Sequence, residues 1–509
     1  MAEYHPYSNA VPFFQEDPTP GIPELDQHRL RSYNLYEQFY WNHPETFKLL
    51  QRGEDEAPIY LPSSKRIVEA THRFLGVDFD FVVSNAAGTS DAQGVLATTI
   101  RDLFKREQFY IKYNSQKRFG LIRGDAIWHI TGDDTKAEGS RISIHAVHPA
   151  RYFPIFADDN PERIVGVHLV DTVPDPKDEN KQLNRRQTYR REVDANGQFT
   201  GTITSELALF ELGKWDDRYL KPADIVQVAV IRPPTALPPA ITTIPVYHIR
   251  NTWEAGWAFG SSLLRGVETI VAAANQGVSD EALALAIHGL GSYWTDASPP
   301  IDPATQQATA WEIGPLRMTE VPQGRQVGRL QGVSSVEPSQ SHINFLTGEA
   351  NTGAGVPDIA AGKVDVSVAE SGISLRLQLA PILASNAERE QTMLGVYDQM
   401  FFDLTTMWYP AYESFTADAS VACVVGDPLP QNREAQIKEI VDLVTAKLIS
   451  VEEGRTKLIE LGWEIEAKAD GLIAEQAALA EATDTFGARV KEELGDGQEV
   501  PSPAGAAQG

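Results

Sequence analysis

The sequence contains a single cysteine, Cys423, in 509 residues. One thiol excludes an internal disulfide and a zinc site built on cysteines, and it suits a reducing compartment such as a cytoplasm. No uninterrupted apolar run approaches the roughly 18 to 20 residues of a membrane-spanning helix. The first 20 residues have neither a basic start nor an apolar core, so we expect no secretory signal there.

Basic residues are also scarce, with 44 Lys and Arg against 70 Asp and Glu, which gives a net charge of −26. This sign is wrong for a protein that wraps nucleic acid by neutralising phosphates. It is useful, however, where DNA has to slide past a protein without sticking to it. Hydrophobic residues make up 42% of the chain and charged residues 22%, so most of the chain can bury a core. The length corresponds to about three or four domains.

The sequence lacks the short motifs of the common enzyme classes. There is no His-Glu-x-x-His, no Gly-x-Ser-x-Gly and no Gly-x-Gly-x-x-Gly after a strand. The loop 355–363 ends in Gly-Lys, but Pro357 stands where a phosphate-binding loop needs glycine, and Val364 where it needs Ser or Thr. His145 and His148 lie three apart in a predicted strand and face opposite sides, which disfavours a shared metal. We therefore expect no catalytic residues, no metal site and no cofactor.

Periodic patterns predict an α+β fold. Aromatic residues from Tyr33 to Phe47 have helical spacing and predict a helix with an aromatic packing face. Further helices are expected at 62–76 and 92–106. The segment of about 107–230 is rich in short β-branched runs and predicts an antiparallel β subdomain. Its charged gaps at 132–139 and 174–184 predict long exposed hairpin loops.

Helical patterns return from Trp253 and are interrupted by a compact β insertion at 292–335. Ser339 is expected to cap the helix that follows, and a long helix is expected past Glu370. Residues 433–462 predict a helical hairpin. Its first apolar face is Ile437, Val441, Val444 and Leu448, and Ser450 with Glu453 forms a capping box for the second helix. The acidic and Pro/Ala/Gly-rich tail 483–509 is expected to be disordered.

Four local patches and the order of the elements have a familiar arrangement over about residues 30–470. The patches are Tyr36–Phe47 leading into Pro62–Arg66, Gly260–Asn275 followed by Ser279-Asp280, Val356–Gly362 with Glu370–Ile373, and the hairpin around Leu448–Ser450. In these features the chain resembles the portal proteins of tailed bacteriophages, most closely those of long-tailed phages of actinobacteria. None of the patches is a catalytic signature.

The resemblance implies a portal-like division of the chain. The expected parts are a mixed α/β wing at 1–250, stem helices at 252–291 and 336–350, a small β clip at 292–335, a tunnel loop at 351–370, a wing return helix at 371–400 and an α-helical crown at 401–482. The wing's β loops are larger than a minimal portal needs, and no role is assigned to them. Small residues at the start of the first stem helix, such as Gly260 and Ser261, would permit close packing around a ring.

The resemblance also implies a function that is structural and not enzymatic. Portal proteins form a ring of about twelve subunits at one capsid vertex, which is the channel for packaging and ejection of double-stranded DNA and the head-to-tail connection. The implied partners are the terminase motor large subunit, a head-tail adaptor, the major capsid protein and scaffold. The protein would assemble in the host cytoplasm and remain in the virion. Twelve copies of −26 each would carry about −312, and this acidic charge suits weak contacts with DNA.

A different class of protein remains open at this stage. A cytoplasmic hydrolase, possibly carbohydrate-active, with a β domain and helical additions is the alternative interpretation. Particle mass separates the two hypotheses. A portal ring contains about twelve subunits, whereas an enzyme of this chain length is typically a monomer or dimer.

Three residues are candidates for the proposed site. Lys363 is the only Lys or Arg between Arg329 and Arg376, and the resemblance places it in the tunnel loop. We expect it to contact DNA phosphates transiently, the alternative being a solvated loop lysine without a role. Trp294 and Trp311 lie in the expected clip and are candidate anchors for the motor or adaptor. The alternative is that each packs within the clip or between adjacent subunits.

Overall fold

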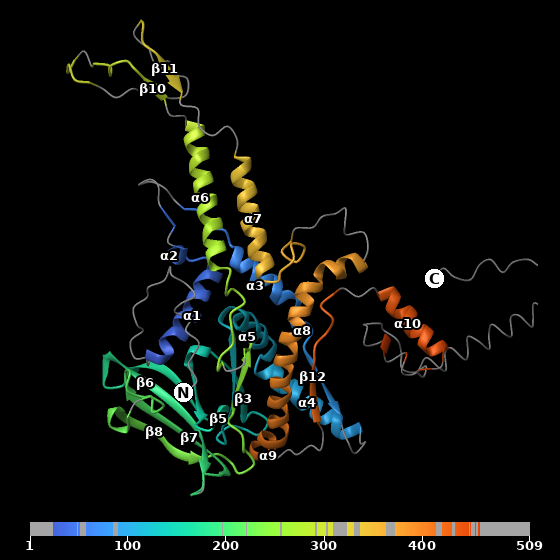
Figure 1. The fold of residues 1–509 in the computed structure, drawn as a ribbon. Helices are drawn as coiled ribbons and strands as arrows, with labels where there is room; N and C mark the ends of the chain where they lie inside the picture. Colours follow the sequence, from blue (N-terminus) through green and yellow to red (C-terminus); the bar gives the residue numbers. More distant parts are fainter. Residues whose placement is uncertain are drawn as a thin grey trace, which may run out of the picture. The chain divides into compact units, whose positions relative to one another are not determined.

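The fold mixes helices and antiparallel strands, as expected for an α+β protein (Figure 1). The computed structural model describes residues 24–47, 49–50, 58–84, 90–195, 197–219, 221–254, 257–290, 293–301, 304–308, 323–329, 336–362, 372–413, 420–429, 433–446, 448, 454 and 457–458. The chain divides into two compact units, Met1–Pro428 and Leu429–Gly509. No helix among these described residues combines the length and the apolar character needed to cross a membrane.

In the described residues up to Arg123, the first unit contains five helices, with strand β1 (Asp80–Ser84) between the third and the fourth. The helices are α1 (Glu24–Trp41), α2 (Pro44–Phe47), α3 (Ser63–Phe74), α4 (Ser90–Arg106) and α5 (Phe109–Arg123). The aromatic face predicted for α1 is buried, and α3 and α4 confirm the helices expected at 62–76 and 92–106. Helix α5 corrects the expected start of the β subdomain at 107. The strand propensity of its Phe, Tyr and Ile residues does not decide the structure here. The segment is helical because Phe109, Tyr113 and Gln116 recur on one buried helical face.

Two antiparallel sheets follow. The first has the order β3-β2-β9 and consists of β2 (Asp125–Gly132), β3 (Ile142–Val147) and β9 (Val246–Arg250). The second has five strands in sequence order, β4 (Tyr152–Ala157), β5 (Asn160–Asp175), β6 (Asp178–Val193), β7 (Phe199–Glu211) and β8 (Gln227–Ala236). The antiparallel β region is therefore confirmed, but it comprises two sheets, which share one apolar cluster that includes Ile127 of β2 and Val167 of β5.

The two charged gaps in the β region have different structures. The long loop expected at 174–184 is wrong, because β5 and β6 remain paired there up to a tight turn at Pro176-Lys177. Turn-forming residues are tolerated on these strands since most of the side chains there face solvent. The loop at 132–139 is present and is held in place. The carboxylate of Glu413 accepts hydrogen bonds from the backbone N–H groups of Gly139 and Arg141.

The end of the first unit packs into its main core. Helix α8 (Gly372–Asp403) continues through a π-helical turn at Leu404–Trp408 into α9 (Tyr409–Tyr412), and β12 (Ser420–Val424) pairs with β1 (Asp80–Ser84). Trp128 in β2 donates a hydrogen bond to Tyr397 in α8 over 3.1 Å. Residues 401–413 and 420–424, which the sequence analysis assigned to the crown, thus belong to the first unit and contribute to its main core. Pairing between strands about 340 residues apart leaves no local signal in the sequence.

The predicted stem corresponds to α6 (Glu268–Leu290) and α7 (Glu337–Gly353). Helix α6 starts later than the expected 252, because Gly260 packs its backbone against Gly124 and Gly266 adopts a positive φ of 93°. Helix α7 starts at Glu337, so Ser339 is not its N-cap. Between the two helices, β10 (Tyr293–Thr295) and β11 (Val327–Arg329) form an antiparallel pair inside the predicted clip.

In the second unit the described helix is α10 (Arg433–Thr445). The expected apolar face is wrong in part, because Val441 is 51% exposed and Leu448 is 73% exposed. Ile440 is buried instead, and Val444 lies against the backbone of Gly454. The side of α10 that packs is therefore the side of Ile440 and Val444. Gly454 has no side chain, so its backbone can approach Val444 closely. The capping box Ser450 with Glu453 lies outside the described residues.

Candidate functional site

Helices α6 and α7 lie side by side, and the chain between them carries β10 and β11 (Figure 1). Glycines bring the two helices close together. A Cβ atom on Gly277 would lie 3.1 Å from Ile343, and one on Gly353 would lie 3.5 Å from Val267. Further along the pair, the side chain of Gln340 donates a hydrogen bond to Glu281 over 2.9 Å. The spacing of the pair is therefore set by small residues, as in other close helix contacts.

Replacing Gly277 with leucine is expected to push the helix pair apart. The larger side chain has to displace Ile343, and overpacking of this kind typically costs about 1–3 kcal/mol. Gly348→Leu is the matched control, because nothing lies within 4 Å of a Cβ atom at that position of α7. The control should be neutral or slightly stabilising, since leucine is a better helix former than glycine. Equal free energies of unfolding for the two variants would contradict this packing.

The start of α6 is anchored by the N-terminal segment. Asn275, Gln276 and Ser279 accept hydrogen bonds from the backbone N–H groups of Leu61, Leu50 and Ile59 at 2.8, 2.7 and 2.9 Å. In addition, Tyr36 in α1 donates a hydrogen bond of 2.6 Å to Glu268, and both groups are buried. The first half of α6 is thus fixed to the N-terminal part of the same unit by polar contacts that satisfy an otherwise unpaired stretch of backbone.

The helix pair carries charge of only one sign. Its charged residues are Glu268, Asp280 and Glu281 on α6 and Glu337 and Glu349 on α7, with no Lys or Arg on either helix. Of these, Glu337 and Glu349 are exposed. A phosphate backbone passing along this surface would be repelled and not bound.

Trp294, the first candidate anchor, lies on β10. It is paired with Gly328 of β11, and its indole covers the face of that glycine so closely that a Cβ atom there would lie 2.5 Å from the indole nitrogen. The ring is nevertheless 45% exposed. The position therefore combines packing against β11 with an accessible aromatic surface. Trp311 and Lys363 lie outside the described residues.

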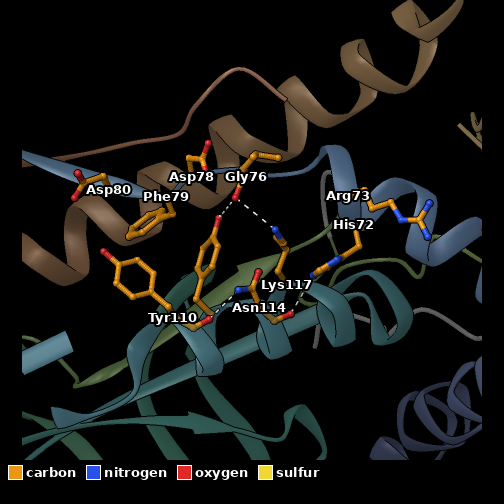
Figure 2. Close-up of a pocket in the computed structure, with 11 residues that line it drawn as sticks. His72, Arg73, Gly76, Asp78, Phe79, Asp80, Tyr110, Asn114 and Lys117 are labelled. Atoms are coloured by element: carbon orange, nitrogen blue, oxygen red, sulfur yellow. Dashed lines mark hydrogen bonds between the residues drawn. The ribbon is translucent and has the colours of Figure 1, made fainter. Parts of the chain in front are cut away.

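A pocket of about 640 Å³ lies at the junction of α3, β1 and α5 (Figure 2). Phe79, Tyr110 and Tyr113 supply aromatic surface, and Tyr113 donates a hydrogen bond of 2.9 Å to the carbonyl of Gly76. Arg73 and Lys117 lie on one side of the view in Figure 2, and the carboxylates of Asp78 and Asp80 lie on the other.

The charges in this pocket are affected by burial. Burial lowers the pKa of Lys117 to about 8, although the nearby charge of Glu390 acts in the opposite direction. Burial and the charges of Lys117 and Arg118 lower the pKa of His72 to about 4, so this imidazole is neutral at pH 7. Arg73 therefore provides the permanent positive charge of the pocket, and Lys117 is mostly protonated at neutral pH.

His168, Asp216 and Asp217 bring three possible metal-ligand atoms within 4.8 Å of one another. Their charges are already matched by the protein. Asp217 accepts a hydrogen bond of 2.6 Å from His168 and pairs with Arg190, while Asp216 pairs with Arg218. Burial lowers the pKa of His168 to about 4. Burial would raise the pKa of Asp217, but the hydrogen bond from His168 and the arginine charges lower it. The cluster is an ionic network, and a metal ion would have to displace arginines.

The sequence analysis identified neither the pocket nor this network. The pocket residues come from three elements that are separated in the chain, and no motif in any one of these elements indicates a shared pocket. The network did have a local signal. Asp216, Asp217 and Arg218 form a run of charged residues directly after Trp215, and Trp215 and Asp216 are fully buried. This run directly after a tryptophan is the one signal in the sequence that could have drawn attention to the network.

Comparison with known proteins adds no functional assignment to this geometry. The chain matches no family model, and it matches no curated protein.

Proposed function

We propose that this chain is a subunit of a portal ring, which forms the channel for genome packaging and ejection at one capsid vertex and connects head to tail. The observation that carries the proposal is the helix pair α6–α7. Two closely packed helices carry a small antiparallel strand pair between them and have carboxylates but no Lys or Arg. This arrangement agrees with the stem and clip that the resemblance implies.

The charge of the helix pair suits a DNA channel. In a ring, the pairs of all copies would surround one axis, and their carboxylates would repel phosphates from every side. Each attractive contact with DNA has to break before the duplex can advance, so a lining without Lys or Arg keeps these barriers low. In this proposal Lys363 makes the few transient phosphate contacts.

A ring also requires faces that bind neighbouring copies. Copies related by rotation about one axis meet through two different faces, so each subunit needs both. Leu285 on α6 and Phe345 on α7 are exposed apolar side chains on the helix pair. Their burial between adjacent helix pairs would stabilise the ring through the hydrophobic effect.

The mass of the purified particle tests the proposal directly. Twelve copies of 56.0 kDa give a ring of roughly 670 kDa, and negative-stain images should show an annular particle. Light scattering supplies the mass, and images of end-on views supply the subunit number. A particle of 56.0 kDa or of twice this mass under all assembly conditions would overturn the proposal and favour the hydrolase interpretation.

The clip is the proposed contact for the terminase motor and the head-tail adaptor. Trp294→Ala is expected to leave the ring mass unchanged and to weaken motor binding about tenfold or more, because exposed aromatic anchors dominate interface energies. Affinity can be measured with the ring immobilised and the terminase large subunit in solution. Trp253→Ala is the matched control, since Trp253 is 43% exposed and lies outside the clip. Loss of the ring in the Trp294 variant, or equal weakening in the control, would contradict the assignment.

A further inference from the structure

The pocket at the junction of α3, β1 and α5 is built by a constrained backbone. Gly76 and Asp78 have positive φ values of 52° and 48°. The backbone between them is held by a hydrogen bond of 2.7 Å from the N–H of Gly426 to the carbonyl of Val77. A left-handed Asp persists only where its surroundings determine the conformation. The carboxylate of Asp78 is therefore presented at the pocket by a defined turn.

Charged groups in the pocket are available to a ligand. Arg73 and Asp78 are both exposed, and neither has an ion-pair partner within the part of the chain that the structure describes. They lie on opposite sides in Figure 2, with Tyr110 and Asn114 of α5 below them in the same view. The hydroxyl of Tyr110 and the aromatic face of Phe79 add polar and apolar surface to the pocket on the side of Asp78 and Asp80. A ligand with a single sign of charge would be attracted at one side and repelled at the other.

We propose that this pocket binds an extended peptide segment of a partner protein, which places a carboxylate at Arg73 and Lys117 and a basic side chain at Asp78 and Asp80. Charge complementarity selects this occupant. A volume of about 640 Å³ accommodates a segment of roughly four residues. Alternate side chains of an extended peptide share one face, so an acidic and a basic residue at positions i and i+2 or i and i+4 can reach both sides. The proposal does not depend on the portal function.

Short peptides provide the first test. The probes are Ac-Ala-Glu-Ala-Lys-Ala-NH2 and Ac-Glu-Ala-Ala-Ala-Lys-NH2, and the controls are the same peptides with two Glu or with two Lys residues. Binding is measured on the full-length protein by saturation-transfer NMR, which observes the peptide and is insensitive to protein size. At least one dipolar peptide should bind about tenfold more tightly than its like-charged controls. Equal binding of dipolar and like-charged peptides, or no binding of any peptide at millimolar concentration, would overturn the proposal.

Charge reversal locates the binding to this pocket. Arg73→Glu and Asp78→Lys should each weaken the dipolar peptide by at least about fivefold. The double variant exchanges the two charges and should recover most of the affinity. Arg163→Glu, an exposed change in the β4–β5 hairpin, is the control and should have no effect. Single variants without effect, or a double variant as weak as the singles, would contradict the assignment.

The source of the segment is tested by particle mass. If a partner protein supplies it, the single variants should have the same mass as the unmodified protein in light scattering. A lower mass in both single variants, restored in the double variant, would show that a second copy of this chain fills the pocket. That result would overturn the partner assignment without bearing on the helix pair or its function.

Discussion

Arg218→Met is expected to lower the free energy of unfolding by about 3–5 kcal/mol. Arg218 is only 6% exposed and pairs with Asp26 of α1 and with Asp216, both of which are fully buried. It also donates a hydrogen bond of 3.1 Å to the carbonyl of Pro154 on the edge strand β4. The variant leaves the buried carboxylate of Asp216 without its arginine, while Asp26 keeps only Arg29, and removing one partner is the costly way to break a buried ion pair. Urea titration provides the measurement.

Arg163→Met is the control for this prediction. Arg163 pairs with Asp159 in the same sheet, but the two side chains are 52% and 70% exposed. Solvent screens such a pair, so its loss should cost less than about 1 kcal/mol. A similar small cost for Arg218→Met would mean that the buried network contributes little to docking α1 on the five-stranded sheet.

Gly124→Ala is expected to destabilise the first unit by more than about 4 kcal/mol. Gly124 ends α5 with a φ of 93°, and a Cβ atom there would lie 2.6 Å from the carbonyl oxygen of Gly260 and 2.8 Å from the backbone of Ser261. Backbone atoms cannot rotate away as a side chain would. The carbonyl of Gly124 also accepts a hydrogen bond of 2.8 Å from Asn251, so any displacement disturbs the segment that leads into α6.

Gly266→Ala separates the steric clash from the backbone strain. Gly266 has the same φ of 93°, but nothing lies within 4 Å of its Cβ position. Alanine there should cost only the left-handed conformation, about 1–2 kcal/mol. Thermal unfolding of both variants gives the comparison. If the two variants were equally destabilised, the close approach of Gly124 to Gly260 would contribute nothing to the cost of the Gly124→Ala substitution.

Local patterns were sufficient for the elements that bury one face along a continuous stretch of chain. In α3, the spacing of Ile67, Val68, Phe74 and Leu75 predicts the helix, Ile67 and Val68 are buried on it, and Gly76 follows its end. The strands β2 and β3 were likewise recognised from their β-branched residues. In each case, the information lies within about ten residues of sequence, because the periodicity of burial matches that of the element.

Segments with mixed signals were decided by tertiary packing. Helix α5 begins with Phe-Tyr-Ile, which favours a strand, and becomes helical because it packs against α1, α3 and β2. The turn at Pro176-Lys177 is short because β5 and β6 continue past the sheet core as a paired ribbon. Charged residues in that ribbon are compatible with strand structure because their side chains face solvent. Composition alone does not distinguish such a solvent-exposed strand from a loop.

Composition and short periodic patterns were enough to establish the α+β class, the acidic charge, the two helices α6 and α7 and the small β insertion between them. The pairing of β1 with β12, the burial of Asp216 and Arg218, and the pocket formed by Arg73, Asp78 and α5 became visible only in the folded chain. These features join segments that are distant in the chain. Their free energy comes from contacts formed only when the whole unit has folded, so no local stretch of sequence encodes them.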